Sequence, residues 1–382
     1  MEQRRFTGNN YWYHETQTSL PAQRAPLVPE AATIEDRFLL GLAQIVGGDV
    51  KSVLRQTQPA LQASRHLYQL LFPAQLPTTL SHTLSLYDRL SSALTVAQVA
   101  GVQRLCNHYA ARLHPLPGPD SSRESNHRLT QITEFVRQLA TQPTLISAAA
   151  LQRLDEVGLS APDIISLSQV VGFVSYQARV VAGIHALLAL PVCWMPGMMV
   201  PPDADGSLFS TIKDWHPLVA PVEMRYATPD QLDALAHCQP LSDLQVAARL
   251  FAHDAQTLSG WSQLLDKLAD DSNNPLVALA AAVAARINGS SVCFSRYPAG
   301  ELCEALKVSV QQGLNVADKQ QQAVIQFAAR LTRTAERISA VHIQPLKDAG
   351  LNLAQIFAVI LSVAVSSWCN RLMQGLGTSQ LS

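Results

Sequence analysis

The sequence contains an internal repeat, in which residues 132–179 align without a gap on residues 324–371 at an offset of 192. Thirteen of the 48 aligned positions are identical. They include Gly158 and Gly350, which follow helical patterns and are typical helix stops, because glycine enters the left-handed conformation at low cost. The repeat therefore predicts that two parts of the chain share one plan of helix, turn and helix.

Helix-start signals recur at the same offset. Ser160 and Asn352 each precede a long apolar helix and have an acid or amide three residues later, which is the spacing of a capping box. Ser147 and Ser339 are the expected N-caps of the helices before these. Composition alone does not align caps and glycines in two Ala- and Leu-rich helices, so we interpret the repeat as a duplication.

The composition favours a large helical core. Hydrophobic residues make up 48% of the chain and charged residues 15%, which excludes disorder for most of it. Almost no stretch alternates apolar and polar residues as strands do. We therefore expect an all-α fold of two tandem pseudo-equivalent helical bundles. The helices expected in the first half cover Val50–Leu71, Thr79–Leu113, Ser125–Ala140, Ser147–Val157 and Ser160–Leu190.

Proline and glycine distribution divides the chain into four parts. Residues 1–32 are expected to form an extended arm, whose Trp12, Tyr13 and His14 dock on the body. Residues 33–190 form the first expected domain, residues 191–228 a proline-rich connector, and residues 229–382 the second domain.

Charge and cysteine usage limit the partners. With 28 basic and 29 acidic residues the net charge is -1, so we expect neither nucleic acid nor membrane as a partner. The six cysteines show no zinc-ligand spacing, and we expect no metal and no cofactor. The polar N-terminus lacks a secretory signal, which favours a cytoplasmic location. Two apolar stretches, Val180–Pro202 and Leu353–Trp368, are predicted to be buried helices.

The most specific pattern lies in the second half, where an apolar helix over Pro275–Gly289 ends in Asn-Gly and is followed by a polar turn with Cys293. This arrangement resembles the alkylhydroperoxidase-D and carboxymuconolactone decarboxylase superfamily, in its peroxidase-related branch. That family places a CxxCxxxH motif directly after such a turn, on a helical bundle that usually oligomerises. Both halves resemble the family, over most of residues 35–377, and the resemblance implies a homodimer.

Taken position by position, the resemblance implies one retained catalytic group. The family's peroxide-attacking cysteine falls on Cys293, and its resolving cysteine falls on Ser290. Its histidine falls on Tyr297 and its proton-relay acid on Ala278. In the first half, the position expected to match Cys293 is Gly101.

The residues themselves limit this chemistry. Ser290 cannot form a local disulfide with Cys293, and a tyrosine at 297, with an ordinary pKa of about 10, is a poor base at neutral pH. Arg296 and a helix N-terminus would favour the Cys293 thiolate, and Cys303 is a candidate resolving thiol. The alternative interpretation is that Cys293 is a small buried apolar residue.

The first half offers a cysteine beside a histidine, but no comparable site. Cys106, His108 and Tyr109 lie on one helix without a third orienting group, so we expect this half to be inert.

Three functions follow, in order of preference. The first is an oxidoreductase that uses Cys293, with Ser290, Arg296 and Tyr297 around it, on a small-molecule peroxide or thiol, with a link to cysteine and thiol metabolism that the resemblance implies. The second is a catalytically inactive helical protein that binds a small molecule or a protein. The third is decarboxylation, for which the sequence supplies no evident base.

Overall fold

The computed structural model describes residues 36–192, 199–210, 214–272 and 274–379, and the arm with Trp12, Tyr13 and His14 lies outside these ranges. The described chain is mostly helical, which confirms the all-α expectation. The strands found in these ranges are β1 (His216–Pro217) and β2 (Gly377–Thr378), which pair antiparallel over two residues each.

The elements of the first half are α2 Leu42–Ile45, α3 Gly48–Gln56, α4 Gln58–Leu71, α5 Leu86–Ala100, α6 Gln103–Leu113, α7 Arg123–Thr141, the 3-10 helix η1 Pro143–Leu145, α8 Ala148–Glu156 and α9 Ala161–Leu187. The connector holds β1 and the 3-10 helices η2 Gly206–Phe209 and η3 Met224–Tyr226. The second half contains α10 Pro229–Cys238, α11 Ser242–Gln245, α12 Ala248–Phe251, the 3-10 helix η4 Ala252–Asp254, α13 Ala255–Ser272, α14 Pro275–Asn288, α15 Ser291–Phe294, α16 Glu301–Val308, α17 Val310–Val316, α18 Lys319–Arg333, the 3-10 helix η5 Ala335–Arg337, α19 Ala340–Asp348, α20 Leu353–Gly375 and β2.

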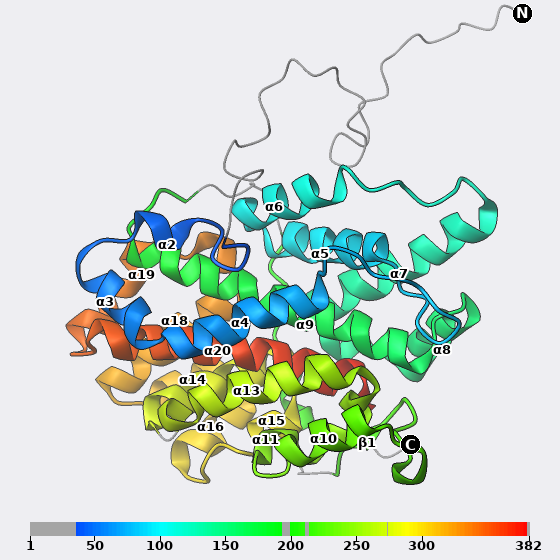
Figure 1. The fold of residues 1–382 in the computed structure, drawn as a ribbon. Coiled ribbons are helices and arrows are strands. Elements are labelled where there is room, and N and C mark those ends of the chain that lie inside the picture. Colours follow the sequence, from blue (N-terminus) through cyan, green and yellow to red (C-terminus); the bar gives the residue numbers. More distant parts are fainter. Residues whose placement is uncertain (1–35, 193–198, 211–213, 273, 380–382) are drawn as a thin grey trace, which may run out of the picture.

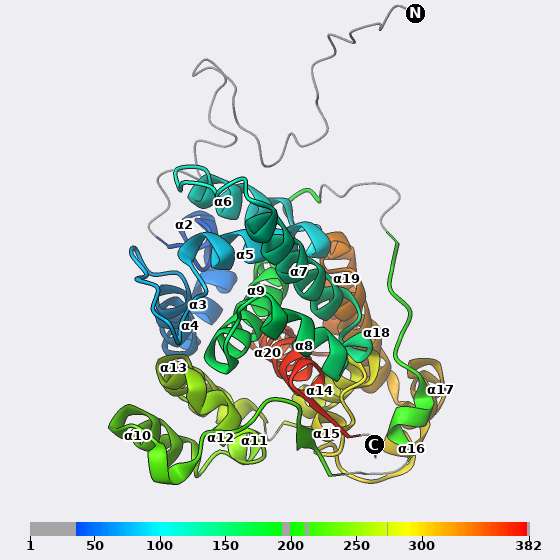
Figure 2. The ribbon, with the colours of Figure 1, turned by 90° about the vertical axis from the view of Figure 1, so that its right-hand side faces the viewer.

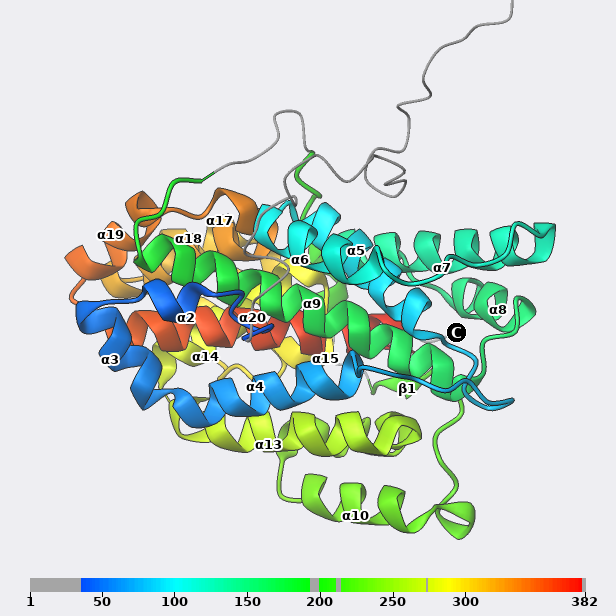
Figure 3. The same cartoon turned by 45° about the horizontal axis from the view of Figure 1, so that its top comes forward.

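Two long apolar helices, α9 and α20, form the centre of the molecule and run side by side (Figures 1 and 3). They are antiparallel, because Gly172 of α9 meets Trp368 of α20 while the later Gly183 meets the earlier Ile360. Shorter amphipathic helices surround them on all sides in the end-on view (Figure 2). The buried apolar residues of both halves belong to one continuous core.

The repeat is visible in the element boundaries. The last residues of α7 and α18, of η1 and η5, and of α8 and α19 match at the repeat offset, and so do the first residues of α9 and α20. Gly158 and Gly350 adopt φ of 85° and 90°, as the helix-stop prediction requires. The capping boxes at Ser160 and Asn352 are both present. Ser147 and Ser339 occupy the N-caps of α8 and α19 as predicted, although the side chain of Ser147 makes no capping hydrogen bond.

Two of the expected helices are broken. The stretch Val50–Leu71 divides into α3 and α4 at Thr57. The stretch predicted as one helix over Thr79–Leu113 divides into α5 and α6, because Gly101 adopts φ of 66° and ends α5. Gly289 ends α14 in the same way, with φ of 83°.

These two stops also correct the residue-by-residue alignment of the halves. Each helix that ends at such a glycine is followed after one residue by a new helix, α6 or α15. Gly101 therefore corresponds to Gly289, and not to Cys293 as the sequence repeat had suggested.

Among the described residues, two helices, α9 and α20, are long and apolar enough to cross a membrane by length and composition alone. Within their most apolar windows, 89% and 61% of the residues are buried inside the protein. Since a helix that is apolar on all sides is also the usual core helix of a globular protein, this length is weak evidence for a span.

Candidate functional site

The Asn-Gly turn before Cys293 has the geometry that the sequence predicts. Gly289 caps α14 in the left-handed conformation, and a Cβ there would collide with the Cγ2 of Thr144. Ser290, the N-cap of the four-residue helix α15, is completely buried, and its hydroxyl has no hydrogen-bond partner among the described residues. This turn is therefore tightly packed against the first half.

The predicted catalytic residues do not converge on a cavity. Cys293 is partly buried, Arg296 is exposed, and Tyr297 is partly buried with its pKa raised by burial and by the nearby Cys303. None of these residues, and not Ser290 either, is among those lining the two described cavities. The predicted site therefore lies outside both of these cavities.

The structure also places Ala278 and Cys303, the predicted positions of the relay acid and the resolving thiol. Ala278 lies in the first turn of α14, at the opposite end of that helix from Ser290. Cys303 is buried in α16, and burial raises the pKa of its thiol, so it is poorly suited to resolve an oxidised cysteine. The described cysteines are all thiols, and no described group of three or more His, Cys, Asp or Glu residues could hold a metal ion.

The histidine of the first half is part of a packed network. The hydroxyl of Tyr68 lies 2.7 Å from Nε2 of His108 and accepts a hydrogen bond from Nη1 of Arg112. Burial, with the charges of Arg112 and Arg37, lowers the pKa of His108 to about 3. His108 is therefore neutral at physiological pH and serves packing rather than catalysis.

A cavity of about 230 Å³ lies between the two halves, where the ends of α7, α14 and α18 meet α9 and α20. Much of its lining comes in pairs that match at the repeat offset: Ala140 and Thr332, Thr141 and Arg333, Gln142 and Thr334, Pro143 and Ala335, Thr144 and Glu336, and Arg179 and Arg371. Equivalent residues of both halves thus face one shared space, which we call the inter-half pocket.

Two buried arginines on the central helices line the inter-half pocket. Arg179 of α9 and Arg371 of α20 are 5% and 3% exposed. Each donates from Nη1 to the carbonyl four residues earlier, on Ser175 or Ser367, at 2.9 Å. Each thereby fixes its guanidinium against its own helix.

The second nitrogen of each guanidinium reaches across to the other half. Nη2 of Arg179 donates to the carbonyl of Thr332 at 2.6 Å, and Nη2 of Arg371 donates to the carbonyl of Ala140 at 2.7 Å. Thr332 and Ala140 are themselves a matched pair of the repeat, so the two contacts are reciprocal. They also satisfy carbonyls near the C-terminal ends of α18 and α7, which lack partners within their helices.

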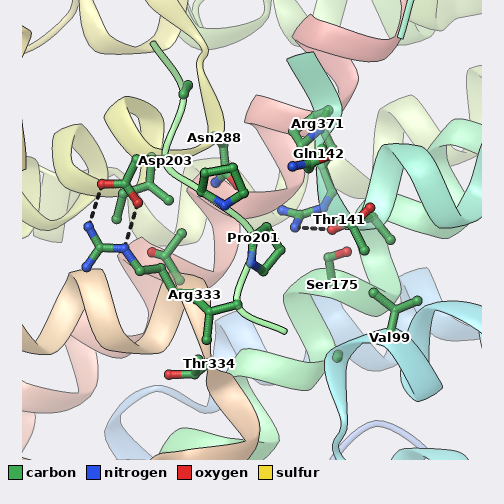
Figure 4. Close-up of a pocket in the computed structure, with 18 of the residues that line it drawn as sticks. Val99, Thr141, Gln142, Ser175, Pro201, Asp203, Asn288, Arg333, Thr334 and Arg371 are labelled. Carbon is green, nitrogen blue, oxygen red and sulfur yellow. Dashed lines mark hydrogen bonds and ion pairs between the residues drawn. The ribbon is translucent and has the colours of Figure 1, made fainter. Parts of the chain in front are cut away.

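Several buried donors at the pocket remain unused. Among the described residues, Nε of Arg179, Nε of Arg371 and Nδ2 of Asn288 have no hydrogen-bond partner. Asn288, Arg371 and Pro201 all line the pocket (Figure 4). A buried donor without a partner costs about 1–3 kcal/mol, so three of them at one cavity are unusual in a native fold.

Burial also lowers the pKa values of the two arginines. It lowers the pKa of Arg179 to about 10, and the charge of Glu336 opposes this shift. For Arg371 burial again lowers the pKa, and the positive charge of Arg179 lowers it further. The two guanidinium groups therefore repel each other across the pocket.

The last part of the connector closes one side of the pocket. The carboxylate of Asp203 accepts two hydrogen bonds from Arg333, the first from Nε at 2.7 Å (Figure 4). The next residue, Ala204, donates to the carbonyl of Ile287 and accepts from Nη1 of Arg286. Residues 199–205, which we call the strap, are thereby held across the pocket from α18 to α14.

A second cavity of about 250 Å³ lies on the other side of η5, beside Arg104, Asn107 and His185. It shares Glu336 with the inter-half pocket. Of the buried donors without a partner, none lines this second cavity in the described ranges.

Sequence reasoning missed the inter-half pocket as a site. Arg179 and Arg371 are an identical pair at the repeat offset, but the sequence pattern alone assigns them no role. The available signal was an arginine at the same position of two otherwise apolar helices, since an arginine is almost never buried without a specific partner.

In comparisons with known proteins, neither a protein-family model nor a curated protein matches this sequence.

Proposed function

We propose that this protein is a helical binding module that holds a small polar molecule in the inter-half pocket. The observation that carries the proposal is the set of three buried donors, on Arg179, Arg371 and Asn288, that face one cavity without partners among the described residues. A bound molecule with acceptor atoms would satisfy them, which a cavity shaped only by packing would not require.

The repeat supports a specific origin for such a pocket. We infer that a bundle of the alkylhydroperoxidase-D-like type was duplicated, giving two pseudo-equivalent domains that pair within one chain. The matching element boundaries and the reciprocal arginine contacts support this inference. A site between the two copies is then lined by equivalent residues from each copy.

Filling the pocket tests the proposed function. Ala100, in the last turn of α5, lines the cavity, whereas Ala149 of α8 is exposed and serves as the matched control. The probes are small acids, amines, sugars and amides, read by the thermal shift of the purified protein. We expect at least one probe class to raise the melting temperature of the wild type and of Ala149→Phe, and not of Ala100→Phe. Stabilisation that survives Ala100→Phe would place binding elsewhere.

A thiol oxidoreductase, the first preference of the sequence analysis, is the second candidate function. Cys293 is partly exposed, as are Cys106 and Cys369, whereas Cys238 and Cys303 are buried. This candidate predicts that dilute peroxide adds oxygen to the wild type but not to Cys293→Ser in intact-mass spectra. An identical adduct pattern in both proteins would remove it.

A further inference from the structure

The two arginines of the inter-half pocket limit the chemistry of its occupant, an inference that rests on the proposed function. Within the described chain, neither Arg179 nor Arg371 forms an ion pair with a carboxylate. Both donate only to carbonyl oxygens, and a carbonyl carries no net charge to compensate a guanidinium. Two buried positive charges thus face the same cavity, although burial of an unpaired charge is strongly unfavourable.

The carboxylates at the pocket are each matched by another cation or by hydrogen-bond donors. Asp203 forms the ion pair with Arg333, and Glu336 forms one with Arg337 at 3.0 Å. Asp205 accepts from the backbone of Ser207 and has its pKa lowered by its hydrogen bonds with Ser207 and by the charge of Arg286. Glu336 also acts on Arg179 at longer range. The excess positive charge therefore stays with the arginine pair.

The hydrogen-bonding pattern also favours an anionic occupant. A guanidinium has five N–H donors and no acceptor, and each of these two uses only Nη1 and Nη2 for the carbonyls. The remaining buried donors include Nε on both arginines and Nδ2 of Asn288, which have no acceptor among the described residues and which acceptor atoms of an occupant would satisfy. An oxygen anion supplies several acceptors and the missing negative charge together.

The placement of the pair suggests where the anion sits. Arg179 and Arg371 come from equivalent positions of α9 and α20, and the charge of Arg179 acts on Arg371. An anion between them would contact both halves at once. At about 230 Å³, the cavity has room for a compact acid.

We propose that the inter-half pocket binds a small oxyanion, bearing a carboxylate, phosphate or sulfate group, between the guanidinium groups of Arg179 and Arg371.

The test compares charged and neutral probes of the same shape on the full chain. The probes are succinate and its neutral diamide succinamide, together with inorganic phosphate and inorganic sulfate, at constant ionic strength. Titration calorimetry and thermal shift report binding. We expect succinate, phosphate or sulfate to bind and succinamide not to bind, and the tightest of the three anions identifies the carboxylate or the phosphate-like source.

Lysine variants keep the positive charge but remove Nε and the planar guanidinium. Arg179→Lys and Arg371→Lys should each weaken binding of the tightest anion about tenfold or more, as expected for a lost charge-assisted hydrogen bond. Arg89→Lys is the matched control, because Arg89 is also buried, donates to the carbonyl of Leu71 and has an Nε without a partner among the described residues, but lies away from the pocket. Equal anion affinity in all three variants would overturn the proposal.

The outcomes separate this inference from the proposed function. If succinamide binds as tightly as succinate and Ala100→Phe abolishes both, the pocket binds small molecules but the oxyanion inference is wrong. If no probe binds the wild type, or if Ala100→Phe leaves anion binding intact, both proposals fail. If a lysine variant does not fold, as judged by circular dichroism, the comparison of succinate with succinamide in the wild type and in Ala100→Phe still tests the oxyanion proposal.

Discussion

At the scale of single residues, buried polar side chains in this protein fall into two groups. His108 and Tyr68 hydrogen-bond each other inside an aromatic cluster that lines neither described cavity, and that environment holds the imidazole neutral although its Nδ1 has no partner among the described residues. Arg179 and Arg371 instead keep donors unused at a cavity. Burial alone is therefore not a signal for function, whereas burial with unused donors facing a shared space is.

The neutral state of His108 predicts a dependence of stability on pH. Its pKa is about 3 in the folded protein and about 6.5 in the unfolded chain, so the unfolded chain binds the extra proton between these values. The contribution of neutral His108 to the free energy of unfolding is complete above pH 6.5 and is lost as the pH falls toward 3. His108→Gln keeps an acceptor for Tyr68 but does not titrate.

Urea unfolding of the wild type and His108→Gln at several pH values checks this prediction. Between pH 8 and pH 5 the wild type should lose about 2 kcal/mol of its free energy of unfolding relative to His108→Gln. A difference that stays constant over this range would show that His108 titrates normally in the folded state.

At the scale of elements, the contact between α9 and α20 depends on small residues. A Cβ at Gly172 would collide with Cδ1 of Trp368, whose indole donates to Gln169 and stacks on Trp261. Glycine is normally unfavourable inside a helix, so its presence here is explained by the close approach of the two helices.

Gly172→Ala should therefore destabilise the protein, although alanine is the better helix former. We expect a loss of about 1–3 kcal/mol in the free energy of unfolding, measured by chemical denaturation with tryptophan fluorescence. Gly118, where a Cβ would meet nothing within 4 Å, is the control, and Gly118→Ala should change stability by less than about 0.5 kcal/mol. Equal effects at the two sites would contradict this account of the helix contact.

Element boundaries were predictable where local chemistry determines them. The capping boxes at Ser160 and Asn352 and the stops at Gly158 and Gly350 are satisfied within a few residues of chain, so the sequence reveals them. The break at Gly101 was missed because the apolar pattern continues through it, and only the observed left-handed φ separates α5 from α6.

At the scale of the whole molecule, one core spans both halves. The sequence repeat predicted that two parts of the chain share one plan. It could not show that α9 and α20 pack against each other, nor that Arg179 reaches Thr332 and Arg371 reaches Ala140 across the two halves. Contacts between residues so far apart in the chain leave no local pattern. For the same reason the reasoning from motifs led to Cys293, which carries a motif, and not to the pocket.

Assembly beyond one chain stays a prediction from the family resemblance. We expect a homodimer, because bundles of the family that the sequence resembles pair through apolar helix faces. Sedimentation should give a species of twice the chain mass of 41.5 kDa at micromolar concentration. A single species at the chain mass would be evidence against the dimer.

The most direct test of the central claim, that Arg179 and Arg371 hold an oxyanion between the halves, is a crystal structure obtained in sodium selenate. Data collected at the selenium absorption edge locate the anion without ambiguity. The account predicts an anomalous peak inside the inter-half pocket, within hydrogen-bonding distance of Nε of both arginines. Selenate bound at surface arginines, with the pocket holding only water, would contradict it.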